Sequence, residues 1–159
     1  MNATRKPFRV LFVCMGNICR SPAAEIVFRH HVVRAGLSDT ITTDSAGTIG
    51  FHSGKGPDPR MSATLASRGY EIFGKSRQIT AEDLDAFDLV LVMDRENLEN
   101  VRSLDRSGDR HDKIRLFMEY GTRHGVTEVP DPYYGGQPGF EHVADLVEDA
   151  SKGLLRSLS

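Results

Sequence analysis

The chain contains little cysteine and no tryptophan, and the cysteine count narrows its class. Only two of its 159 residues are cysteine, Cys14 and Cys19, so a disulfide framework is excluded. Low cysteine use is typical of a reducing compartment. At this length we expect a single domain over residues 1–159, which buries about two-thirds of the surface that its unfolded form exposes.

An excess of charge of one sign and long hydrophobic runs are also missing. The net charge is −2, which argues against a protein whose main task is to bind nucleic acid. No run approaches the roughly 18 apolar residues of a membrane span, so no membrane partner is expected. The apolar run at 10–13 follows basic residues but is too short for a signal peptide. We therefore expect a cytoplasmic protein with a flexible tail over residues 1–6, although non-classical secretion leaves no mark in a sequence.

Short apolar runs alternate with helical patterns along the chain. The runs at 8–13 and 89–93 are typical of buried strands. Capping residues and glycines bound the other expected elements, which are strands at 40–45 and 113–117 and helices at 22–35, 58–68, 80–87, 95–105 and 139–158. Ser21 is expected to cap the helix that Pro22 opens. This alternation predicts βαβ units and a parallel sheet.

A parallel sheet binds ligands at the carboxyl ends of its strands, which makes the loop after the first strand the expected functional position. Gly16 and Asn17 in this loop tolerate positive φ angles, so its N–H groups can form an anion nest. Arg20 can bind two phosphoryl oxygens with its planar guanidinium. Cys14 faces the same positive groups, which favour the nucleophilic thiolate, and the hydroxyl of Ser21 can donate to that sulfur.

Two other interpretations of this loop explain less. The first makes Cys14 a small buried hydrophobic residue that ends a strand, but this does not explain Gly16, Asn17, Arg20 and Ser21. The second is a zinc site made by two cysteines and two histidines, namely Cys14, Cys19, His30 and His31. Adjacent histidines on a helix point about 100° apart, which disfavours the metal site.

The loop VCMGNICRSP resembles the signature of the low-molecular-weight protein tyrosine phosphatases. Other segments of that family follow in order: TDSAGT at 43–48, RQIT at 77–80, MDRENL at 93–98 and DPYYG at 131–135. The resemblance implies a single-domain, doubly wound, four-stranded parallel sheet of the flavodoxin-like type. It also implies a metal-independent hydrolase without a cofactor that acts on tyrosine-phosphorylated proteins or peptides. Phosphate and oxyanions such as vanadate would then be inhibitors.

The same resemblance implies a role for each matching residue. Cys14 would be the nucleophile, Arg20 the phosphate clamp, and Asp131 the general acid and then the base of a reaction with a cysteinyl-phosphate intermediate. The phosphate would be bound by Met15, Gly16, Asn17, Ile18, Cys19, Arg20 and Ser21. The walls of an aryl slot would be Phe51, Tyr133 and Tyr134, and the support of the loop would come from Asn17, Ser21, Ser45 and Asp94. Alone, an Asp-Pro pair indicates only a turn, and the aromatic residues suit plain packing.

The chain also departs from the family pattern. In many relatives an acid at the position of Asp94 pairs with a histidine, but Gly74 stands at the histidine position, so Lys75 or Arg77 becomes the expected substitute. Cys19 is either a resolving thiol that protects Cys14 or an inert buried thiol. The scattered histidines are interpreted as surface or capping residues, namely His52, His111, His124 and His142.

Three rival functions fit the sequence less well. A thioredoxin-coupled arsenate reductase needs further cysteines, and none follows Cys19. A phosphoryl carrier needs neither a clamp such as Arg20 nor an acid such as Asp131, because fast hydrolysis would defeat its purpose. A module that only binds phosphotyrosine would lack Cys14 or Asp131.

Overall fold

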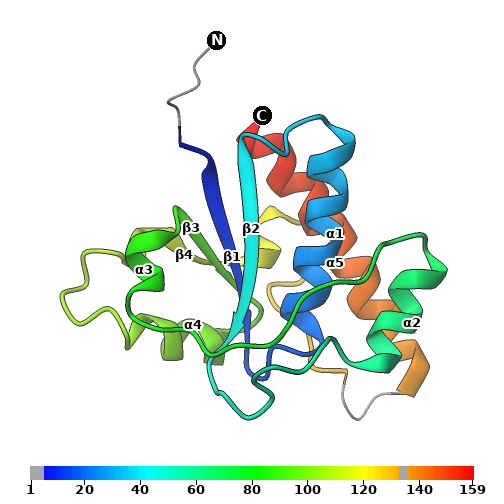
Figure 1. The fold of residues 1–159 in the computed structure, drawn as a ribbon, viewed down its shortest axis with the longest axis horizontal. Coiled ribbons are helices and arrows are strands. Elements are labelled where there is room, and N and C mark those ends of the chain that lie inside the picture. The colour runs from blue at the N-terminus through cyan, green and yellow to red at the C-terminus, as the bar shows by residue number, and fades with distance from the viewer. Residues whose placement is uncertain (1–5, 133–135) are drawn as a thin grey trace.

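Four parallel strands form the centre of the computed structural model, which describes residues 6–132 and 136–159 (Figure 1). Tyr133, Tyr134 and most of the tail expected at 1–6 lie outside the described residues. The strands follow the order β2-β1-β3-β4, where β1 is Phe8–Cys14, β2 is Ile41–Gly47, β3 is Leu89–Val92 and β4 is Ile114–Leu116. The prediction of an α/β fold with a four-stranded parallel sheet is confirmed.

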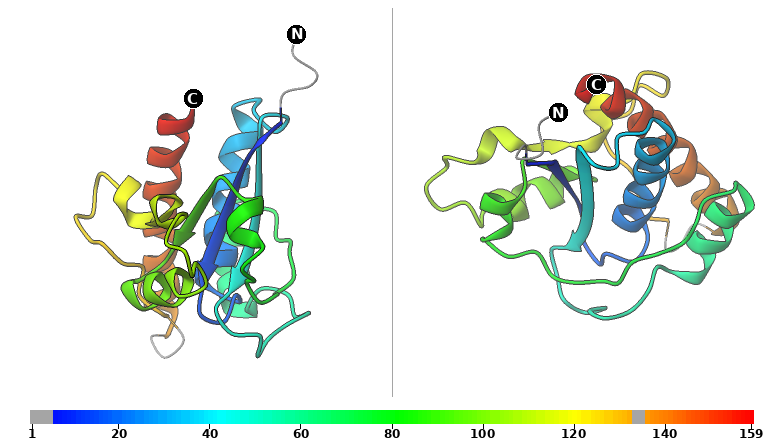
Figure 2. Two further views of the ribbon diagram at one scale, coloured as in Figure 1. Left: turned by 90° about the vertical axis from the view of Figure 1, so that its left-hand side faces the viewer. Right: turned by 45° about the horizontal axis from the view of Figure 1, so that its top comes forward.

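Helices cover both faces of this sheet. They are α1 (Arg20–Arg34), α2 (Pro59–Ser67), α3 (Asp83–Ala86), α4 (Arg95–Arg102) and α5 (Gly136–Leu158), with short 3-10 helices at His111–Lys113 and Phe117–Tyr120. Figures 1 and 2 show α1 beside α5 on one face, with α2 beyond them, and α3 and α4 on the other. Within the described residues, none of these helices has the length and apolarity that a membrane crossing requires.

The central strand β1 is buried on both faces, which is why its sequence is an unbroken apolar run. Its alternate side chains enter two separate cores, so Val10 and Phe12 face α1 and α5 while Leu11 and Val13 face α3 and α4. The ring of Phe12 lies edge-on to Phe28, with centroids 5.7 Å apart. A strand packed in this way holds the residue at its end, Cys14, in a fixed position.

Several element boundaries differ from those expected. Helix α1 begins at Arg20 and its N-cap is Cys19, without a side-chain cap, so the expectation that Ser21 caps this helix is wrong. The hydroxyl of Ser21 lies beside the sulfur of Cys14 instead. Helix α3 is shorter than expected because the Asp83 carboxylate accepts from the Thr80 N–H, which makes a turn before the helix. Helix α4 ends three residues earlier than expected and α5 begins three residues earlier.

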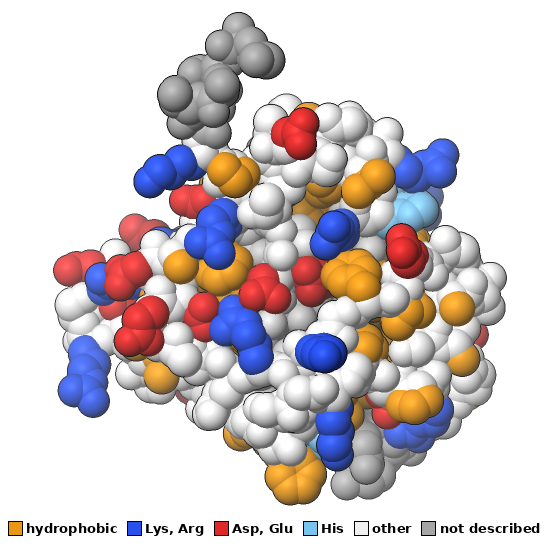
Figure 3. Space-filling model, in the orientation of Figure 1, with side chains coloured by type: hydrophobic (Ala, Val, Ile, Leu, Met, Phe, Trp, Pro, Cys, Tyr) orange, Lys and Arg blue, Asp and Glu red, His pale blue; other side chains and the backbone are white. Residues whose placement is uncertain are grey.

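The lower end of the molecule in Figure 1 is formed by loops that follow the strands. These loops expose three large hydrophobic side chains, Met15, Ile49 and Phe51, and the space-filling view shows hydrophobic atoms at that edge (Figure 3). Charged residues of both signs interleave over much of the remaining visible face. An apolar rim at the carboxyl ends of the strands suits a binding site there.

Candidate active site

The sulfur of Cys14 lies at the end of β1, where the chain turns back around it. Cys14 is 2% exposed, and the Asn17 N–H donates to its sulfur across 3.3 Å. The hydroxyl oxygen of Ser21 lies 3.0 Å from the same sulfur. Asn17 reaches this position with a φ of 55°, the left-handed conformation that asparagine tolerates better than most residues. The loop therefore presents hydrogen-bond donors to one buried sulfur.

The side chain of Asn17 ties this loop to its surroundings. Its amide nitrogen donates to the hydroxyl oxygens of Ser21 and Ser45, at 2.8 and 3.0 Å. Its amide oxygen accepts from the Arg77 N–H at 3.0 Å. All three amide contacts are to buried or partly buried groups, and Asn17 itself is 1% exposed. The residues expected to support the loop, Asn17, Ser21 and Ser45, are thus brought together in one network.

Arg20 is held by groups from two other loops. One terminal nitrogen of its guanidinium donates to Asp94 Oδ2 at 2.6 Å and to the Val129 carbonyl at 3.1 Å. Burial in itself lowers the pKa of Arg20, but the neighbouring Cys14 and the hydrogen bond to Asp94 outweigh it and raise the pKa above its ordinary value. Arg20 is therefore a permanent buried cation.

The partner of Asp94 differs from the one expected. We expected Lys75 or Arg77 to take the place of a histidine beside Asp94, but the carboxylate of Asp94 pairs with Arg20. Arg77 instead pairs with Asp44 and Asp83, at 3.0 and 2.9 Å. The reason is that the Arg77 backbone is fixed by Asn17, on the β2 side of the loop, while Asp94 follows β3.

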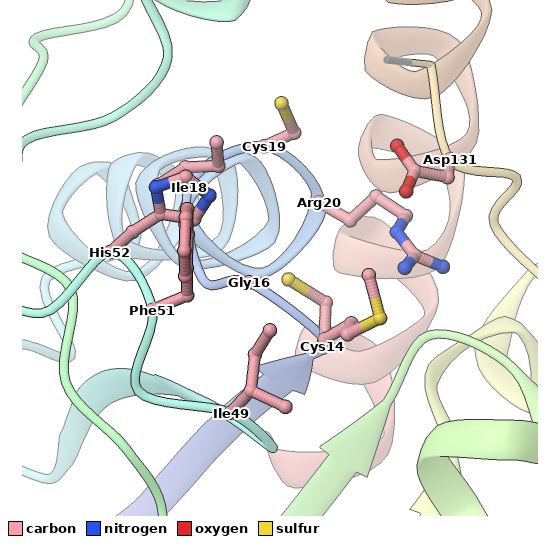
Figure 4. Close-up of a pocket in the computed structure, with 10 residues that line it drawn as sticks. Cys14, Gly16, Ile18, Cys19, Arg20, Ile49, Phe51, His52 and Asp131 are labelled. Carbon is pink, nitrogen blue, oxygen red and sulfur yellow. The ribbon is translucent and has the colours of Figure 1, made fainter. Parts of the chain in front are cut away.

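A pocket of about 310 Å³ opens over Cys14 and contains the remaining expected side chains. Its lining residues are Cys14, Met15, Gly16, Ile18, Cys19, Arg20, Ile49, Phe51, His52 and Asp131. Figure 4 shows Asp131 and Arg20 on one side, with Ile49, Phe51 and His52 across from them. Phe51 is 79% exposed, as a wall at the mouth requires and a packing residue does not. The other expected walls, Tyr133 and Tyr134, lie outside the described residues.

His52 was missed as a pocket residue, because its surroundings in the sequence carry no motif. We expected a surface or capping role, but the ring of His52 lies against Gly16 and edge-on to Phe51, with ring centroids 4.9 Å apart. A Cβ on Gly16 would lie 3.2 Å from the ring, so the absence of a side chain at Gly16 makes room for it. His52 thus lies in the pocket wall between Phe51 and the loop over residues 14–21, which we call the phosphate loop after its predicted role.

The two cysteines of the loop have unlike surroundings. Burial, with the negative charge of Asp58, raises the pKa of Cys19 to about 12, so Cys19 is a neutral thiol at neutral pH. Both cysteines are free thiols in this structure. In the described part of the chain, no group of three or more His, Cys, Asp and Glu side chains is placed to hold a metal ion. His30 and His31 pack edge-on to each other on α1.

Comparison with known proteins places this site in a family. Residues 9–159 match the profile described as "Low molecular weight phosphotyrosine protein phosphatase". The chain belongs to the low molecular weight phosphotyrosine protein phosphatase family. A Synechocystis sp. protein that bears the family's name is 51% identical over 150 residues, which cover 94% of this chain and 96% of that protein.

Solved structures of similar proteins have the same fold. The crystal structure of YfkJ from Bacillus subtilis has a TM-score of 0.91 and 38% identity, and the match covers 98% of this chain and 97% of YfkJ. A structure of DARP, a Drosophila arginine phosphatase, has a TM-score of 0.86 and 32% identity, with 94% and 97% of the chains covered. The predicted family membership is confirmed, and the family and relatives support protein-tyrosine-phosphatase activity for this phosphatase.

Proposed function

We propose that this phosphatase hydrolyses phosphotyrosine in proteins or peptides through a cysteinyl-phosphate intermediate. The observation that carries the proposal is the position of Cys14 in one pocket with Arg20 and Asp131. The Asn17 N–H, the Ser21 hydroxyl and the start of α1 all favour negative charge on this sulfur. Cys14 is therefore the nucleophile of the proposed reaction.

In the first step the thiolate of Cys14 attacks phosphorus, and the bond between phosphorus and the tyrosyl oxygen breaks. Asp131 gives its proton to that oxygen, so a neutral phenol leaves. In the second step water attacks the phosphorus of phospho-Cys14 while the Asp131 carboxylate takes a proton from the water. The bond between phosphorus and sulfur breaks, and the sulfur leaves as the thiolate. Phosphate is released, and the sulfur returns to its contact with Ser21.

Arg20 and the phosphate loop bind the phosphoryl group in both steps. Because Asp94 and Val129 occupy one terminal nitrogen of Arg20, the Nε and the other terminal nitrogen are the donors proposed for two phosphoryl oxygens. The backbone N–H groups of residues 15–21 belong to the loop that leads from Cys14 into α1, and we propose that they bind the rest of the charge, as at other helix N-termini. Phosphate and vanadate should accordingly compete with substrate.

The walls of the pocket favour an aryl phosphate over a phosphoguanidine. DARP is called an arginine phosphatase, so an N-phosphorylated substrate is the relevant rival. Here the space above Cys14 is bounded by Ile18, Ile49 and Phe51, which can contact a flat apolar ring but carry no side-chain acceptor for a guanidinium. The one carboxylate that lines the pocket, Asp131, is assigned to the leaving oxygen. We therefore propose phosphotyrosine rather than phosphoarginine.

The acid role of Asp131 is tested with aryl phosphates whose phenols differ in acidity. The Asp131→Ala variant should hydrolyse esters of weakly acidic phenols about 10²–10⁴-fold more slowly than the unmodified enzyme, but esters of strongly acidic phenols with little loss. An equal loss for all phenols would contradict the assignment of Asp131. Turnover in excess EDTA checks the expectation that no metal ion takes part.

The substrate class is tested with two peptides of one sequence, one carrying phosphotyrosine and the other phosphoarginine. We expect a higher kcat/KM for the phosphotyrosine peptide, and a preference for phosphoarginine would reject the proposal. The Cys14→Ser variant should bind the phosphotyrosine peptide without releasing phosphate. Release of phosphate by this variant would exclude Cys14 as the nucleophile.

A further inference from the structure

Ser76 touches both loops that form the catalytic pocket, although it does not line that pocket. It lies on the segment before the bridge that pairs Gly47 with Gln78. Ser76 is 6% exposed and lines a small recess on another side of the phosphate loop, together with Asn17 and Ser45. The proposed mechanism gives no role to the buried hydroxyl of Ser76.

The backbone of Ser76 binds the loop that carries the pocket walls. Its N–H donates to the Lys55 carbonyl at 2.7 Å, and its own carbonyl accepts from the Gly54 N–H at 2.8 Å. Gly54 has a φ of +86°, a conformation that suits glycine and lets the wall loop turn back toward Ser76. The loop over residues 48–56, which carries Phe51 and His52, is thereby fixed at its far end.

The hydroxyl of Ser76 binds the phosphate loop. It donates to the carbonyl oxygen of Asn17, the residue in the left-handed conformation. A carbonyl turned into the pocket would repel phosphoryl oxygens, and this hydrogen bond holds it in the recess instead. Since φ and ψ of one residue set the directions of its N–H and C=O together, the same bond helps to keep the Asn17 N–H on the Cys14 sulfur.

We propose that Ser76 is a positioning residue, which acts through Asn17 and couples the aryl-wall loop to the phosphate loop. The proposal deepens the proposed function and rests on it for the meaning of the pocket. Its physical content is that one hydroxyl keeps a strained peptide in the orientation that stabilises the thiolate and admits phosphate.

The test compares the Ser76→Ala variant with the unmodified protein in two assays that need no turnover. The first is the rate of Cys14 alkylation by iodoacetate at about pH 6, with the labelled sulfur located by mass spectrometry, because this rate follows the thiolate fraction. The second is the affinity for inorganic phosphate. The net contribution of one hydrogen bond corresponds to a change of about two- to tenfold in an equilibrium constant. We therefore expect the alkylation rate and the phosphate affinity each to fall by about that factor. The kcat with an aryl phosphate should fall as well.

Two further variants separate positioning from general stability. Ser76→Thr keeps the hydroxyl and should restore the alkylation rate and the phosphate affinity. Ser67→Ala is the control, because it also removes a serine hydroxyl that donates to a carbonyl, at 2.7 Å, but at an exposed position within α2. A lower Tm is the only effect expected of this control, and the alkylation rate and the phosphate affinity should stay unchanged. If the threonine variant does not fold, the comparison of the two alanine variants still decides.

The proposal is overturned if Ser76→Ala lowers only the Tm, or if its alkylation rate and phosphate affinity change no more than those of Ser67→Ala. Failure of the proposed function has a different signature. An unmodified protein that hydrolyses no aryl phosphate would refute that function, while the alkylation and phosphate assays would still report on Ser76.

Discussion

The ion pair between Arg20 and Asp94 is the most direct target for a quantitative test. Asp94 has two tasks, since one carboxylate oxygen accepts from Arg20 at 2.6 Å and the other caps α4 by accepting from the Asn97 N–H at 2.7 Å. Asparagine caps a helix as well as aspartate does. The Asp94→Asn substitution therefore keeps the shape and the cap and removes the charge opposite Arg20.

The size of the effect follows from how far the pair is buried. Removal of one partner from a fully buried ion pair costs about 3–5 kcal/mol. Here the Arg20 side chain is 5% exposed but that of Asp94 is 23% exposed, so water partly screens the pair and we expect about 2 kcal/mol. For a domain of this size that is a fall in Tm of about 4–8 °C. Loss of one anchor of Arg20 should also lower kcat/KM by about tenfold or more.

Thermal unfolding with and without saturating phosphate measures this effect. Phosphate binds the folded state and supplies a negative partner for Arg20, so saturating phosphate should raise the Tm of both the variant and the unmodified protein. The matched control is Glu128→Gln, the same change of charge in an exposed pair with Arg95 at 3.9 Å, and it should shift stability by less than about 1 kcal/mol. Equal Tm shifts for Asp94→Asn and Glu128→Gln would refute the reasoning.

Three further predictions concern other parts of the molecule. A Cβ on Gly153 would lie 1.8 Å from the Tyr120 carbonyl oxygen, so Gly153→Ala should lower the free energy of unfolding by about 3 kcal/mol in urea titrations, and an unchanged midpoint would contradict this close approach. Burial raises the pKa of Cys19 to about 12, so iodoacetate at neutral pH should label Cys14 at least about a hundredfold faster; equal labelling would contradict the assignment. Burial alone raises the pKa of Asp83, but hydrogen bonds from Arg77 and Thr80 outweigh it and lower the pKa. The contribution of Asp83 to stability is therefore present above about pH 4 and is lost as the pH falls further. Asp83→Asn should weaken this acid dependence in denaturation curves, and an unchanged pH profile would count against it.

The sequence predicts most reliably what neighbouring residues determine. The phosphate loop is one continuous segment between a buried strand and a helix, so its residue types can be interpreted together before any contact is known. The structure places Cys14, Asn17 and Ser21 in mutual contact there. Ser21 shows the limit of such local reasoning, because a serine before a proline is a good helix cap in isolation, but here a sulfur competes for its hydroxyl.

Contacts between distant segments could not be predicted in the same way. Arg20 and Asp94 are 74 residues apart, and Asn17 and Ser76 are 59 apart. Serine and histidine are common surface residues, so neither Ser76 nor the pocket residue His52 has a local pattern that marks it. Such contacts depend on which strand ends lie side by side, and no single segment of the sequence determines the order of strands in a sheet.

The order of the strands explains how one edge of the sheet collects all of these groups. The connection from β1 to β2 carries α1 on one face, while that from β3 to β4 carries α4 on the other, so a crevice opens at the carboxyl ends between them. Each loop at this edge then contributes a separate part: Cys14 follows β1, the pocket walls follow β2, Asp94 follows β3, and Asp131 lies beyond β4. The phosphate loop is held by the buried side-chain contacts of Asn17, whereas the wall loop over residues 48–56 is held by backbone hydrogen bonds to Ser76. In the proposed mechanism the reacting sulfur and the pocket walls therefore come from different loops of the same edge.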